Sequence, residues 1–199
     1  AINLSKDDIS FYPIIYWPIT DNENGLSDNM INKVQVYMKN GGLIVFDTRD
    51  LSPTNIITKN KSKEQKALKA ILKSLDLPIL IKVPESHVIR RSFYLLDKLP
   101  GRYTGGDVWV EATAMNSKDG VSSVIIGGND WASAWAKDSN YKPLYSVIPG
   151  GEKQREFSYR FGVNLVMYAM TGNYKADQVH IKSILKRLNN KPNKTKEIE

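Results

Sequence analysis

The sequence predicts an α/β fold, in which helices cover both faces of a mostly parallel β-sheet. Three short apolar runs, at 12–17, 43–46 and 79–83, have the length and continuity of buried strands. Helical patterns separate these runs, and strands that alternate with helices form parallel sheets. Two later runs joined by a turn signal predict a β-hairpin, so the sheet should also contain an antiparallel pair.

The first half of the chain contains two helices with recognisable ends. The helix predicted at 28–40 follows Ser27, a residue type that caps helix N-termini, and it stops at a glycine pair. The helix predicted at 62–75 opens with Ser62 and Gln65, which fit a capping box. Its apolar residues recur at i, i+3, i+4 and i+7, so one face should pack against the sheet.

The second half of the chain predicts the hairpin and then three helices. Apolar and polar residues alternate at 108–112, and an Asp-Gly turn leads into a second apolar run at 121–126. The helices are expected at 131–135, 153–171 and 177–188. The middle helix should end at Gly172, and it is apolar around most of its circumference, which predicts that it is buried.

Composition and charge limit the classes of protein to which this chain can belong. The chain has 199 residues, of which 41% are hydrophobic and 25% charged, as expected for one globular domain. We predict a single α/β domain over 1–188 and a disordered, basic tail over 189–199. Much of the net charge of +7 lies near the C-terminus and on the helix at 62–75. Since no nucleic-acid-binding motif accompanies this charge, no nucleic-acid partner is expected.

Several kinds of reactive site are excluded or disfavoured by the residues present. The chain has no cysteine, so it has no disulfide, no thiolate zinc site and no cysteine nucleophile. The G-x-S-x-G serine elbow and the glycine motifs of nucleotide-binding loops are also missing. Only two histidines are present, His87 and His180, which limits any imidazole-based metal site. We therefore predict neither a bound metal nor a cofactor.

Polar side chains follow two of the predicted strands at the point where each strand ends. Asp47, Arg49 and Asp50 come directly after one strand, and Asn129 and Asp130 follow another. Open α/β sheets bind ligands outside the carboxyl ends of their strands, because loops after parallel strands emerge at the same edge. The sequence therefore predicts that these residues converge on one crevice.

Two further residues are candidates for the same crevice. His87 follows the third predicted strand, and Arg102 belongs there only if its glycine-rich loop folds back over that edge. An acidic pair beside arginines suits a ligand with both a cationic or hydroxyl group and an anionic group. The alternative is structural: Asp47 caps a turn, Asn129 or Asp130 caps a helix, and the arginines brace loops.

Specific motifs resemble a known bacterial family. They lie at 11–18, 41–50, 91–96, 100–103, 129–131, 160–165 and 171–177. The family is a C-terminal domain of unknown function in bacterial membrane proteins whose N-terminal region is similar to aerotolerance (Bat-type) anchors. The resemblance implies a flavodoxin-like three-layer sandwich similar to class I glutamine amidotransferases. It also implies one more strand and helix ahead of Ala1, so the chain would lack part of its sheet.

The resemblance further implies a membrane-anchored parent protein in a Gram-negative bacterium, on either the periplasmic or the cytoplasmic side. Amidotransferases of this fold need a cysteine, so their chemistry is excluded here. We expect a domain that binds a small polar ligand or a protein partner in a membrane complex. The alternatives are a hydrolase that uses a metal or carboxylate at the strand ends, and a scaffold with an apolar surface patch.

Overall fold

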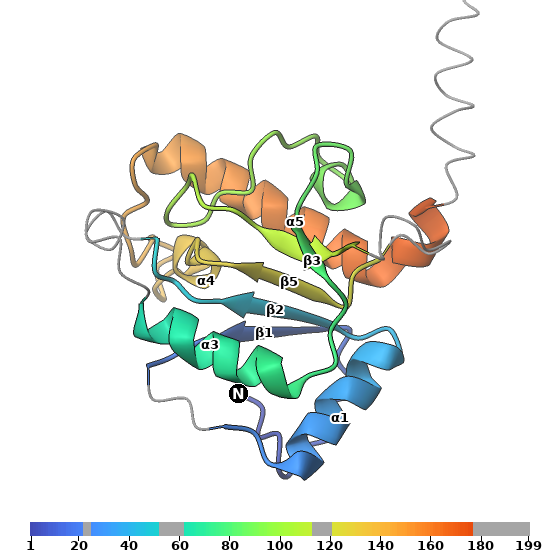
Figure 1. Cartoon of the computed structure of the whole chain (residues 1–199). Coiled ribbons are helices and arrows are strands. Elements are labelled where there is room, and N and C mark those ends of the chain that lie inside the picture. The colour runs from blue at the N-terminus through green and yellow to red at the C-terminus, as the bar shows by residue number, and fades with distance from the viewer. Residues whose placement is uncertain (22–24, 52–61, 113–120, 177–199) are drawn as a thin grey trace, which may run out of the picture.

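The computed structural model describes residues 1–21, 25–51, 62–112 and 121–176. These residues form an α/β domain with one mixed sheet (Figure 1). In chain order the elements are β1 (Ile14–Pro18), α1 (Asp28–Lys39), β2 (Leu43–Asp47), α3 (Lys63–Ser74), β3 (Leu80–Lys82), the 3-10 helix η1 (Val88–Arg90), β4 (Trp109–Glu111), β5 (Val124–Gly127), α4 (Trp131–Trp135) and α5 (Gly151–Ala176).

The five strands lie in the order β1-β2-β5-β4-β3. The predicted parallel pairing of the first two strands is confirmed, with Ile14 opposite Leu43, and β5 pairs in parallel with the other side of β2. The predicted hairpin is also confirmed, because β4 and β5 are antiparallel. A mostly parallel sheet is not confirmed. The connection from β3 to β4 contains only the short η1 and no crossover helix, so β4 returns antiparallel to β3 as well.

Alternating side chains of β2 enter two apolar layers, one on each face of the sheet. Ile44 and Phe46 pack under α1 and α3, whereas Leu43 and Val45 pack under α4 and α5. All five residues of β2 are buried, as expected for a strand between two helical layers. Figure 1 shows this arrangement, with the arrowheads of β1, β2 and β5 at one edge of the sheet.

Both predicted helix caps are present. The Ser27 hydroxyl accepts a hydrogen bond from the amide of Met30 at 3.5 Å, and the Ser62 hydroxyl accepts one from the amide of Gln65 at 3.0 Å. The Gln65 side chain donates to Asp50. This contact ties the start of α3 to the loop that follows β2.

The end of the long helix differs from the prediction. Helix α5 continues through Gly172 to Ala176. A glycine in a helix interior costs about 1 kcal/mol, which by itself does not end a helix that is already long. The predicted helix at 177–188, the predicted tail at 189–199 and the Asp-Gly turn of the hairpin lie outside the described residues. Within the described ranges, no helix is both long and apolar enough to cross a membrane.

Candidate functional site

The Asp47 side chain is the centre of a hydrogen-bond network at the carboxyl edge of the sheet. It is fully buried at the end of β2. One carboxylate oxygen accepts from the amides of Arg49 at 3.0 Å and Asp130 at 3.2 Å. The other accepts from the amide of Trp131 at 2.8 Å and from the Tyr16 hydroxyl at 2.6 Å. This network joins the ends of β1, β2 and β5.

The backbone at Asp130 is shaped to reach Asp47. Asp130 has φ 55°, in the left-handed region that residues other than glycine seldom adopt, and it directly precedes α4. This turn allows the amides of Asp130 and Trp131 to point to the same carboxylate. The Tyr16 hydroxyl also accepts from the amide of Ala132 at 3.3 Å, so the first turn of α4 is held by both β1 and β2.

The loop that carries Arg102 folds back over this edge. The amides of Arg102 and Tyr103 donate to the carbonyls of Asp130 at 3.2 Å and Asn129 at 3.0 Å. Gly101 is required for this approach, because a Cβ there would lie 2.3 Å from the carbonyl oxygen of Asn129. The Arg102 guanidinium lies 3.5 Å from Asp130 Oδ2.

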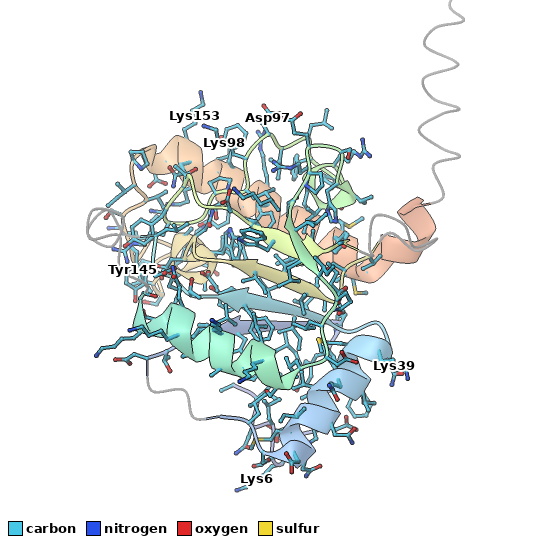
Figure 2. The ribbon with its side chains drawn as sticks, viewed as in Figure 1. Lys6, Lys39, Asp97, Lys98, Tyr145 and Lys153 are labelled. Carbon is cyan, nitrogen blue, oxygen red and sulfur yellow. The ribbon has the colours of Figure 1, made fainter. Side chains whose placement is uncertain are left out.

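Arg102 is further positioned by two aromatic rings. Its guanidinium lies 5.3 Å from the ring centroid of Tyr103 and 5.2 Å from that of Tyr145, and its Nε donates to the carbonyl of Ser146 at 3.2 Å. These are cation–π distances. Tyr145 is labelled in Figure 2 at the edge toward which β2 and β5 point, whereas Lys39, at the end of α1, lies on the opposite side. The side chain of Arg102 is partly exposed, so it can meet a ligand.

Two buried oxygens in this group have no hydrogen-bond partner. They are Asn129 Oδ1 and Asp130 Oδ1, on residues that are 2% and 4% exposed. The other groups of the same side chains are engaged: the Asn129 amide nitrogen donates to the carbonyl of Leu99 at 2.9 Å, and Asp130 Oδ2 faces Arg102. One acceptor on each of these two consecutive residues therefore remains unused.

The sequence profile of a family described as "Domain of unknown function (DUF4159)" matches residues 1–170. The chain belongs to this family. The matched region includes Asp47, Arg102, Asn129 and Asp130. A comparison with curated proteins finds no match.

Two of the residues predicted for the crevice have their side chains engaged elsewhere in the DUF4159 domain. The Arg49 guanidinium donates to the carbonyl of Ile19 at 2.8 Å. The Asp50 carboxylate accepts from Thr48, from Ser62 at 2.9 Å and from Gln65. Asp50 thus fastens the loop after β2 to the start of α3.

His87 is not brought to the Asp47 group. Its ring packs against Tyr168 with 5.7 Å between centroids, and the Tyr168 hydroxyl accepts from the amide of Ser122, just before β5 begins. Asn129 and Asp130 follow the other end of β5. The physical reason is the turn after β3, in which the amide of His87 donates to the carbonyl of Pro84 and the chain folds back over the sheet face.

Burial shifts the pKa of three groups in the DUF4159 domain. It raises the pKa of the Asp47 carboxyl, and the hydrogen bonds from Tyr16 and the three amides partly offset this. Burial and the adjacent Asp47 charge raise the pKa of Tyr16, which therefore remains a hydrogen-bond donor. Burial, with Arg90 and Arg91 adding, lowers the pKa of His87 to about 4, so its ring is neutral at pH 7.

Two residues that organise this edge were not predicted from the sequence. Tyr16 supplies the hydroxyl on Asp47, and Gln154 of α5 donates to the carbonyls of Gly101 at 2.9 Å and Arg102 at 3.2 Å. A tyrosine one residue before the end of a predicted strand was the available signal for Tyr16. Nothing local in the sequence marks Gln154 as part of this edge, because the two carbonyls that it contacts there, those of Gly101 and Arg102, are more than fifty residues away.

The arrangement offers hydrogen bonds and charge rather than a cluster of metal ligands. In the described part of the chain, no three His, Cys, Asp or Glu side chains are grouped so that they could hold a metal ion. Asp47 already accepts four hydrogen bonds. The groups that remain without a hydrogen-bond partner are the buried Oδ1 atoms of Asn129 and Asp130, and the Arg102 side chain beside Asp130 is partly exposed.

Proposed function

We propose that this domain binds a small polar ligand at the carboxyl edge of its sheet, through Asn129, Asp130 and Arg102. The observation that carries this proposal is the pair of buried oxygens, Asn129 Oδ1 and Asp130 Oδ1, that lack a partner. A buried acceptor without a hydrogen bond costs about 1–3 kcal/mol. A ligand that donates to these oxygens would recover that free energy.

The charges define the chemical class of the ligand. The two free acceptors favour a group that donates hydrogen bonds, such as an ammonium or a hydroxyl. The Arg102 guanidinium favours a carboxylate or phosphate, with which it makes bidentate contacts. A small amino acid or hydroxy acid carries both kinds of group. A protein partner that presents the same groups at its surface would use the same contacts.

We assign no reaction to this site. Asp47 is occupied by structural hydrogen bonds, and no specific observation favours the hydrolase alternative. The function supported best is therefore binding.

The first test is a binding measurement. We expect a member of a panel of amino acids and hydroxy acids, including serine, glutamate and lactate, to bind the domain in isothermal titration calorimetry. Asp130→Asn should weaken this binding at least about tenfold, equivalent to about 1.4 kcal/mol. Circular dichroism would verify that the variant is folded.

The matched control is Asp107→Asn, which makes the same change at an exposed residue paired with Lys82 at 2.7 Å. This variant should bind the probe as the unmodified domain does. The proposal would be overturned if no member of the panel binds at millimolar concentration. It would also be overturned if Asp130→Asn and Asp107→Asn retain the same affinity.

We also propose that the domain belongs to a membrane-anchored protein of a Gram-negative bacterium, with a fold similar to the flavodoxin-like class I glutamine amidotransferases. The support is the motif resemblance, together with helices on both faces of the sheet. Fractionation of cells that express the full-length parent protein tests the anchoring. Recovery of that protein only in the aqueous fraction would contradict it.

A further inference from the structure

A pocket of about 400 Å³ lies between helix α1 and the loop that leads into β1. It is at the amino edge of the parallel strands, because Pro13 and Gly42, which line it, come directly before β1 and β2. Figure 1 shows α1 ending at this side of the sheet, away from the arrowheads of β1, β2 and β5. The pocket is therefore distinct from the site at Asn129 and Asp130, which follow the carboxyl end of β5.

The loop beside the pocket is held in place without a ligand. Ile9 is 2% exposed and packs in the apolar layer beneath α1. The Lys33 ammonium of α1 donates to the carbonyl of Asp7 at 2.9 Å, and the Tyr37 hydroxyl donates to the carbonyl of Tyr12 at 2.8 Å. A site that is ordered in advance loses less conformational freedom when a ligand binds.

The pocket combines an aromatic ring with exposed polar side chains. Tyr12 lines it and is 46% exposed, and Phe11, the preceding residue, is 81% exposed. Helix α1 contributes the exposed Asn29 and Asn32, and the loop contributes the exposed Asp8. An amide both donates and accepts hydrogen bonds, whereas a carboxylate accepts them. A ligand in this pocket would therefore meet donors and acceptors beside an apolar ring.

The charged groups of the pocket balance each other. Of the lining residues, Asp8 and Lys33 are the charged ones. The amide of Ser10 donates to Asp8 at 2.9 Å and its hydroxyl at 2.7 Å, and these bonds lower the pKa of the Asp8 carboxyl, which is therefore ionised at pH 7. The Lys33 ammonium already donates to two backbone carbonyls of the loop. This balance favours a neutral ligand over an anion or a cation.

We propose that this pocket binds a neutral saccharide. The hydroxyl groups of a sugar donate and accept hydrogen bonds, which matches the amides of Asn29 and Asn32 and the Asp8 carboxylate. The C–H groups of a sugar ring form an apolar face that packs on an aromatic ring such as Tyr12, because the face of that ring carries partial negative charge. The volume lies within the range of small-molecule sites, about 300–1,000 Å³.

The test is a titration of the ¹⁵N-labelled full chain, followed by NMR, with glucose, galactose, N-acetylglucosamine and maltose. Concentrations up to about 10 mM detect a Kd in the millimolar range. We expect at least one of these sugars to shift the amide resonances of 8–13 and of α1. Tyr12→Ala should weaken its binding at least about tenfold, and Asn29→Ala at least about twofold through the loss of a hydrogen bond. The Tyr12 carbonyl that Tyr37 contacts is kept in the first variant, so the loop should keep its conformation.

The matched control is Tyr141→Ala, which removes a tyrosine that is 82% exposed and does not line the pocket. This variant should bind the sugar as the unmodified chain does. The proposal would be overturned if none of the four sugars shifts a resonance at about 10 mM. Equal affinities of Tyr12→Ala and Tyr141→Ala would also overturn it. So would shifts confined to Arg102 and 129–131, which would place the sugar at the opposite edge of the sheet.

Discussion

Asp47 should be a structural residue whose loss costs several kcal/mol. In Asp47→Ala, the amides of Arg49, Asp130 and Trp131 and the hydroxyl of Tyr16 all lose their acceptor. Each buried donor left without a partner costs about 1–3 kcal/mol. Because water entering the space would satisfy some of them, we expect a total loss of about 4 kcal/mol in the free energy of unfolding.

Urea denaturation followed by tryptophan fluorescence measures this loss. Trp131 is fully buried, and its amide is one of the donors to Asp47, so its emission reports on the same region. The control is Asp107→Ala, which removes an exposed carboxylate and its ion pair with Lys82 and should cost less than about 1 kcal/mol. A loss of less than about 1 kcal/mol for Asp47→Ala would refute the structural role and would restore Asp47 as a ligand-binding candidate.

Two further predictions concern buried polar side chains on the α5 face of the sheet. Because burial lowers the pKa of His87 to about 4, the unfolded state binds the extra proton between pH 4 and its own pKa of about 6.5. The free energy of unfolding should therefore fall by about 2 kcal/mol from pH 7 to pH 5. His87→Gln should remove that loss, which urea denaturation at both pH values measures. An unchanged loss in the variant would contradict the role of His87. Asn164→Leu should lower the free energy of unfolding by about 3 kcal/mol, because the buried Asn164 amide forms hydrogen bonds with the backbone of Ile89, Phe93 and Tyr94. The control is Asn32→Leu, which makes the same change at an exposed position. Equal urea midpoints for the two variants would contradict this prediction.

Local signals in the sequence were sufficient to predict most of the secondary structure. Ser27 and Ser62 cap the helices that they were expected to cap, because a cap depends on a side chain and an amide only three residues apart. The parallel pairing of the first two strands followed from two continuous apolar runs with a helix between them. The far end of α5 departed from its local signal, because the helix continues past Gly172.

The neighbourhood of Asp47, Asn129 and Asp130 was also accessible from sequence, since loops that follow parallel strands emerge at one edge. The role of each residue could not be predicted from the sequence. The fold aims three amides and a tyrosine hydroxyl at Asp47, and it leaves one oxygen each on Asn129 and Asp130 without a partner. These differences arise from distances of a few ångströms that no residue pattern specifies.

Among the described residues, the sequence alone determined where most helices and apolar strands lie and that β4 and β5 form a hairpin. It also excluded cysteine chemistry. Each of these depends on residue type or on neighbours close in the chain. The tertiary structure decided that β5 lies beside β2 and that β3 lies at the far edge of the sheet. It also moved His87 away from Asp47 and placed Gln154 under the Arg102 loop. These outcomes depend on pairings between segments tens of residues apart, where many registers satisfy the same local pattern and only the packing of the whole core selects one.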